Sequence, residues 1–185
     1  MNKNIKHKLT FDEAGQEIQE VCFDLLRAAP FYGHVMGSIN RSLVEGTDQM
    51  EPAVLESLGL STVKMTLSYE LWEPLYSQEK INRMFHEVLH LVFLHPWKDK
   101  EEASNIGLFY TACDLSVNMY CDDKTALRLE NFEKLCRRHG VKIDTDGGYF
   151  SIYNSLIDLF RAIPGNIMKK HNMKKKFLEI MNTLL

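Results

Sequence analysis

The sequence lacks any long apolar run, and its four cysteines never form a CxxC pair. A helix that crosses a membrane needs about 20 mostly apolar residues, and the first residues also lack the apolar core of a secretion signal. Closely spaced cysteine pairs would indicate a zinc ribbon or a redox motif. We therefore expect a cytoplasmic protein with reduced thiols, in which the cysteines act as small buried apolar side chains.

An excess of charge of one sign is missing as well. The 185 residues carry 22 Lys and Arg against 25 Asp and Glu, which gives a net charge of −3. This balance offers no whole-chain argument for binding nucleic acid or a membrane. The exception is a basic amphipathic tail, residues 166–185, in which five lysines fall within 169–176. A solvated terminal helix is one interpretation of the tail, and docking on a protein partner, a nucleic acid or an anionic membrane is the other.

Alternation of apolar and polar residues, which marks a half-buried strand, is scarce. It is clear only in residues 60–72 (LSTVKMTLSYELW), which predict a strand or one arm of a hairpin. The fold class is therefore α+β, dominated by helices around a small sheet. We predict one domain over residues 1–165, followed by the tail. The apolar residues recur at helical spacing in six stretches, 11–28, 30–43, 78–94, 106–121, 126–139 and 149–163.

The most informative stretch is FHEVLHLVFLHP, residues 85–96. His86 and His90 are four residues apart, which places them about 40° apart on one face of a helix. Two imidazoles held in this way can both bind one zinc ion at about 2.0–2.1 Å. Glu87 projects beside the pair, where it can take a proton from a water that zinc activates. This HExxH pattern is typical of zinc metallopeptidases.

A catalytic zinc needs a third protein ligand, and the sequence offers several. His95 lies five residues after the HExxH pattern and is turned well off the face that carries His86 and His90. It could cap the helix or form a hydrogen bond to a metal ligand, and direct binding of the metal is the alternative. Glu101 and Glu102 lie in a charged turn. Asp114 lies inside an apolar helix, where a carboxylate needs a partner, and Asn118 follows one turn later, where it could orient that carboxylate. We select Asp114.

Two functions from different classes remain open at this point. A fourth position left to water predicts a peptidase that acts on a peptide or protein substrate. A fourth protein ligand, for which His95 is the obvious choice, predicts a catalytically inactive binding or adaptor module stabilised by its metal. In the peptidase, the VKMTLSY strand could bind substrate by edge pairing, and Tyr149 or Tyr153 could donate to the oxyanion, with simple packing as the alternative for both.

FHEVLHLVFLHP, followed by LFYTACDLSVNMY, resembles the bacterial metallopeptidase-like domain that usually stands before a von Willebrand factor A-like domain. The resemblance covers roughly residues 10–162. It implies a zincin-like fold, in which a small sheet packs on the active-site helix, with Asp114 as third zinc ligand. The family elements read here His86, Glu87, His90, His95, Ala112, Asp114 and Asn118.

Two features depart from the family pattern. No arginine follows soon after the His-Pro pair at residues 95–96, where the resemblance leads us to expect one that steadies substrate. The 185 residues also hold no von Willebrand factor A-like domain, so the partners that such a domain recruits are not implied.

Overall fold

The computed structural model describes residues 8–48, 51–59, 62–98, 103–121 and 129–162. The chain divides into two compact units, Met1–Lys98 and Asp99–Leu185. The predicted class is confirmed, because helices dominate and the strands form one small sheet. The basic tail lies outside the described residues, so the domain boundary at residue 165 stays a prediction. Within the described part of the chain, no helix is both long and apolar enough to cross a membrane.

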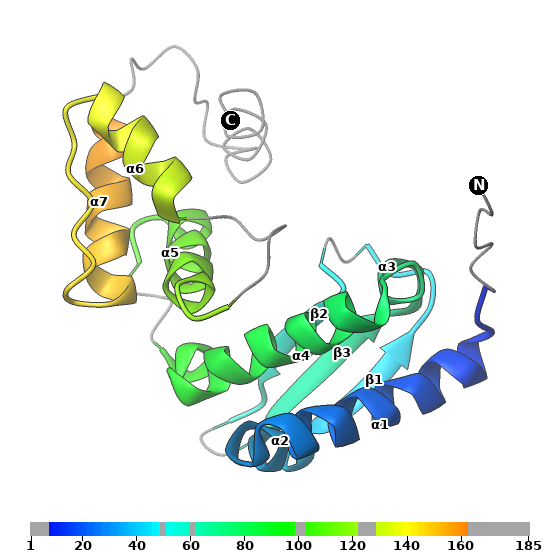
Figure 1. Cartoon of the computed structure of the whole chain (residues 1–185). Helices are drawn as coiled ribbons and strands as arrows, with labels where there is room; N and C mark the ends of the chain where they lie inside the picture. The colour runs from blue at the N-terminus through cyan, green and yellow to red at the C-terminus, as the bar shows by residue number, and fades with distance from the viewer. Residues whose placement is uncertain (1–7, 49–50, 60–61, 99–102, 122–128, 163–185) are drawn as a thin grey trace, which may run out of the picture. The chain divides into compact units, whose positions relative to one another are not determined.

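Two helices open the first unit, α1 (Phe11–Ala28) and α2 (Pro30–Gly37) (Figure 1). The start of α1 is fixed by the residues around Thr10. The Glu13 N–H donates to the Thr10 hydroxyl at 3.3 Å, and the Thr10 N–H donates to the Glu13 carboxylate at 2.7 Å. This reciprocal capping box satisfies two backbone N–H groups that the helix cannot bond internally, and it confirms the predicted helix start.

The helix α2 ends earlier than predicted. It was expected to continue to about Leu43, but it ends at Gly37, and Asn40–Val44 form the strand β1. The prediction was wrong because β1 forms by parallel pairing with β3 (Val63–Ser68), a strand that is distant in sequence. The spacing of apolar residues within a short stretch carries no information about such pairing.

The sheet has three strands in the order β1-β3-β2, with β2 (Ala53–Ser57) antiparallel to β3. The predicted strand is β3, and it forms one arm of a hairpin with β2. Because β3 is paired on both sides, the proposal that this strand binds a peptide by edge pairing is wrong. The predicted strand is also shorter than residues 60–72, since Tyr69–Trp72 turn into the short helix α3.

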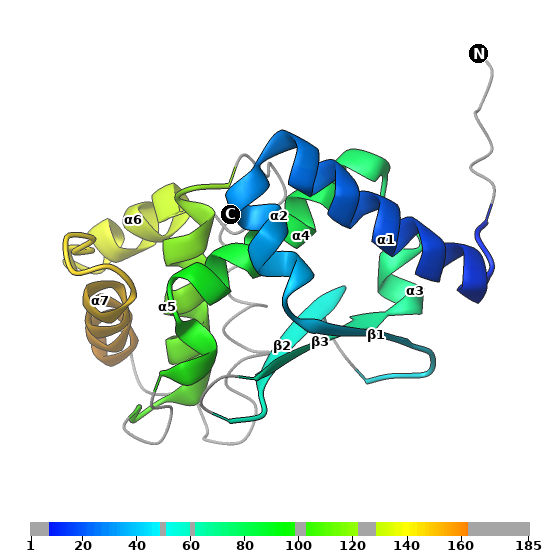
Figure 2. The same cartoon turned by 90° about the horizontal axis from the view of Figure 1, so that it is seen from below.

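The apolar core of the first unit lies between one face of the sheet and its helices. Figure 2 shows α1, α2 and α4 (Ser77–Val92) on the same side of the strands. Alternate residues of β3 point into this core, as the period-two pattern predicts. Its buried side chains come from six of the elements and include Ile18, Leu25, Met36, Ala53, Met65, Leu67, Trp72, Met84 and Val88.

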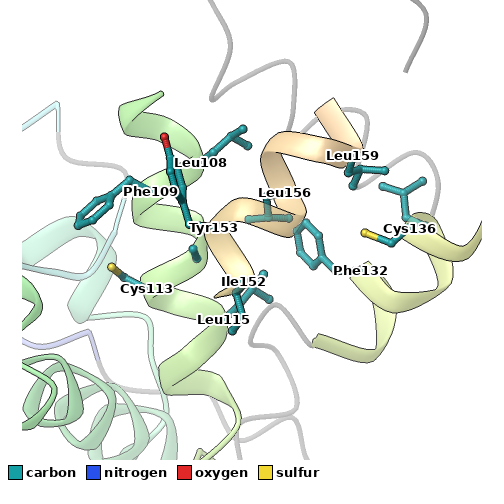
Figure 3. Packing of buried hydrophobic residues seen from close by; sticks show 12 residues of the cluster. Leu108, Phe109, Cys113, Leu115, Phe132, Cys136, Ile152, Tyr153, Leu156 and Leu159 are labelled. Atoms are coloured by element: carbon teal, nitrogen blue, oxygen red, sulfur yellow. The ribbon is translucent and has the colours of Figure 1, made fainter. Parts of the chain in front are cut away.

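The second unit is helical in its described part. Its elements are α5 (Ile106–Asn118), α6 (Leu129–Arg138) and α7 (Tyr149–Ala162), which match the predicted helices to within a few residues. The helix α5 packs against both α7 and α6. Figure 3 shows how side chains of the three helices interlock, with Phe132 of α6 beside Leu156 of α7.

Candidate metal centre

The helix α4 carries the HExxH pattern, and local signals set its limits. Its N-cap is Tyr76, whose N–H donates to the Glu79 carboxylate at 2.7 Å. The helix ends at Val92, two residues before the predicted end. One side of α4 is buried in the core of the first unit, so the residues of the pattern fall on its other side.

His86 and His90 are half-buried and face each other one turn apart. Their Nε2 atoms lie 3.0 Å apart, and their ring centroids lie 4.7 Å apart. Two nitrogens that bind one tetrahedral zinc ion at about 2.0–2.1 Å lie about 3.3–3.4 Å from each other. A separation that needs to open by only a few tenths of an ångström means that the helix has already brought both imidazoles to one point.

Glu87 lies beside this pair and is 6% exposed. Its Oε1 atom lies 3.9 Å from Nη1 of Arg83, one turn earlier on α4, and the same guanidinium atom lies 3.6 Å from Oε2 of Glu51. A neighbouring guanidinium offsets part of the cost of burying a carboxylate and restricts where it points. Sequence reasoning missed Arg83, although its spacing of four residues from Glu87 was a signal for this contact.

His95 does not lie where helical continuation predicted. Leu94 adopts a left-handed conformation with φ of 60°, which ends the helical path, and residues 95–97 then form the short 3₁₀-helix η1. Because of this turn, the His95 ring lies next to His90, with 3.0 Å between the Nδ1 atoms of the two residues. Trp97 attaches η1 to the β2–β3 hairpin, because its indole N–H donates to the Gly59 carbonyl at 3.0 Å.

Asp114 is half-buried on α5, between residues that are buried. One ligand atom from each of Asp114, His86 and His90 lies within 4.8 Å of the other two, which makes these residues a group that could hold a metal ion. His95 is not a member of this group. Asn118 is also half-buried and lies one turn after Asp114; its predicted role in orienting the carboxylate stays a prediction. Glu101 and Glu102 lie outside the described residues.

The two tyrosines considered for the oxyanion make packing contacts in the second unit. The Tyr153 hydroxyl accepts a hydrogen bond from the Asn105 N–H at 3.2 Å and lies 3.1 Å from the Ser104 hydroxyl, at the start of α5. The Tyr149 ring lies edge-on to Phe109, with 5.8 Å between centroids. These contacts favour the packing interpretation for Tyr153, and an oxyanion role for either residue stays a prediction.

The four cysteines are free thiols, and the metal group contains none of them. Cys113 and Cys136 are buried as predicted, whereas Cys22 and Cys121 are half-buried. Burial raises the pKa of Cys22, opposed by Arg41, and burial with the nearby charge of Glu133 raises the pKa of Cys136 to about 11. Because thiols of this kind stay protonated at neutral pH, they are poor nucleophiles and poor metal ligands.

The donor atoms of the group fit a particular class of metal. Two imidazole nitrogens and one carboxylate oxygen are the set found at catalytic zinc sites, and they also suit other divalent transition metals such as iron. No family model matches the chain, and no curated protein or solved structure is significantly similar to it. The resemblance to the metallopeptidase-like domain therefore stays a prediction that rests on the residues of the motif.

Proposed function

We propose that this protein is a zinc-dependent peptidase with a zincin-like fold. The observation that carries the proposal is the pair of facing Nε2 atoms of His86 and His90, 3.0 Å apart, with Glu87 next to the first of these residues. Asp114 belongs with both histidines to a group that could hold a metal ion. Three protein ligands on a metal that favours four leave one position for water and substrate, as a hydrolase requires. A carboxylate adjacent to the ligands favours hydrolysis over the other reactions that such a donor set supports.

The residues have distinct roles in this proposal. His86 and His90 hold the metal through Nε2, and Asp114 holds it through its carboxylate. Bound zinc would polarise the scissile carbonyl and lower the pKa of a water. Glu87 would take a proton from a water molecule and pass it to the leaving amine. Arg83, whose Nη1 atom lies 3.9 Å from the Glu87 carboxylate, would keep that carboxylate in place for both transfers.

Peptide binding is assigned to β2, not to β3. Within the described residues, β2 pairs only with β3, so its other edge offers backbone N–H and C=O groups to an extended peptide. The strand also packs against α4, which carries the HExxH pattern, and against η1, which carries His95. Arg83 supports this assignment, since it links Glu87 on α4 to Glu51, two residues before β2.

The substitution Glu87→Gln tests the proposal. It removes the proton acceptor and keeps the size of the side chain, so we expect loss of peptide hydrolysis by at least about 100-fold with zinc content near that of the wild type. Glu20→Gln, at an exposed position of α1, is the matched control and should leave both unchanged. Loss of zinc together with activity would contradict the role given to Glu87.

Chelation separates the peptidase from a metal-stabilised adaptor. A catalytic ion contributes little to folding, so its removal should abolish hydrolysis while the melting temperature scarcely changes. A large fall in melting temperature, with no hydrolysis before chelation, would favour the adaptor, because the affinity of a structural zinc appears directly as folding free energy.

A further inference from the structure

We propose that His95 is a positioning residue that fixes His90 in the tautomer that a metal ion requires. The inference rests on the proposed metal binding by His86 and His90, and it specifies how one of those ligands is prepared. It concerns three histidines of the first unit whose rings follow one another, with 3.0 Å between facing nitrogens at each step.

The order of the nitrogens limits how protons can be arranged. His90 faces His86 through Nε2 and faces His95 through Nδ1. A neutral imidazole has one N–H donor and one acceptor nitrogen. Two arrangements therefore satisfy both contacts, because the N–H groups point either from His86 towards His95 or from His95 towards His86.

Only one of these arrangements leaves Nε2 of His90 without a proton. It places a proton on Nε2 of His86, which has to leave that nitrogen when His86 binds the metal as well. A ligating Nε2 must present its lone pair, so the proton of His90 must be on Nδ1. The Nδ1–H group then needs an acceptor, and Nδ1 of His95 lies 3.0 Å away. If His95 were the donor instead, His90 would carry its proton on the nitrogen that has to bind the metal.

The surroundings of His95 hold it in this position. The residue is 4% exposed, and its ring centroid lies 5.7 Å from that of Phe93. The left-handed Leu94 sets the direction of the chain into η1, and the bond from Trp97 to Gly59 holds η1 against the hairpin. An acceptor held on the Nδ1 side of His90 is also directed away from the Nε2 side, so it leaves the fourth metal position open.

Two substitutions at His95 test this role through metal affinity. In His95→Asn the amide oxygen can lie near the original Nδ1 and accept the same hydrogen bond, whereas His95→Phe keeps a ring and removes the acceptor. We expect zinc affinity, measured by competition with a chelator, to fall by about 10–100-fold in the Phe variant and to stay within a few-fold of the wild type in the Asn variant. His34→Phe, at an exposed position of α2, is the control for adding a phenyl ring.

A second measurement needs no metal. Long-range ¹⁵N–¹H NMR spectra of the metal-free wild type should show His90 protonated on Nδ1 and His95 protonated on Nε2. Equal zinc affinity in the wild type and the Phe variant, or a proton on Nε2 of His90, would overturn the inference. A wild type that binds no zinc would refute the proposed function, and the NMR result would still decide the tautomer.

Discussion

The two units differ in what they bury. In the described part of the second unit, the buried polar residues are Thr111, Ser116 and Ser155, and each hydroxyl donates to a backbone carbonyl of its own helix. The first unit buries the polar residue Ser68 and two charged residues, Lys80 and Glu87. It also buries His95, so its buried polar residues include three ionisable side chains, whereas those of the second unit are hydroxyls.

The buried ionisable residues of the first unit fall into two kinds, a structural ion pair and residues beside the candidate metal ligands. Ionisable groups are costly to bury, so each needs a partner that offsets the loss of water. Lys80 meets Glu17 across α1 and α4, with the Trp72 ring 5.7 Å from its nitrogen, and forms a structural ion pair. Glu87 and His95 lie instead beside the two histidines whose nitrogens face each other.

The largest expected effect on stability lies in the apolar interior of the second unit. Leu156 is fully buried among the residues of α5, α6 and α7 (Figure 3). Leu156→Ala should lower the free energy of unfolding by about 2–5 kcal/mol, because it removes apolar contacts and leaves a cavity. Urea denaturation measures this loss, with the exposed Leu58→Ala as control. A loss below about 1 kcal/mol would mean that this interior is not closely packed.

The ion pair of the first unit should give a smaller effect. Lys80→Met leaves the Glu17 carboxylate without its ammonium partner, but water still reaches that carboxylate, whose side chain is 25% exposed. We expect the free energy of unfolding to fall by about 1–3 kcal/mol, and to recover in part when Glu17→Gln is added. Lys142→Met, at an exposed position, is the control. No recovery in the double variant would show that Lys80 acts through packing alone.

A further effect concerns pH and appears in both units. The pKa of Cys136 is about 11 in the folded protein, and about 8.5 is usual for an unfolded chain. The unfolded thiol therefore loses its proton first, so stability should fall as the pH rises from about 9 to 11. Cys136→Ala should make that fall shallower, by up to about 1.4 kcal/mol per pH unit.

Chemical denaturation across this pH range gives the comparison for Cys136→Ala, and identical slopes would contradict the assignment. In the first unit, Arg41 opposes the rise in the pKa of Cys22. We therefore expect Cys22→Ala to change the slope less than Cys136→Ala does.

The sequence predicted those parts of the fold that depend on neighbours along the chain. The helical spacing of apolar residues located α1, and the same spacing placed α4 to within two residues. The strand β1 was missed because its residues do not alternate, and it exists only by pairing with β3. Strand β2 was missed for the same reason.

The candidate site shows the same limit. Helical spacing was enough to place His86, Glu87 and His90 together, since all three belong to one helix. The position of His95 could not be predicted, because it depends on the left-handed Leu94, a non-glycine residue in a conformation that such residues seldom adopt. Asp114 was selected for its apolar surroundings, and its role as ligand remains a prediction.

Metal analysis of the purified chain tests the central claim most directly. The wild type, His86→Ala and Asp114→Ala would be measured together, with Asp158→Ala as an exposed acidic control on α7. We predict about one zinc ion per chain in the wild type and in the control, and strong loss in the other two variants. A wild type without a bound divalent metal, or an Asp114→Ala variant that keeps its full complement, would contradict the account.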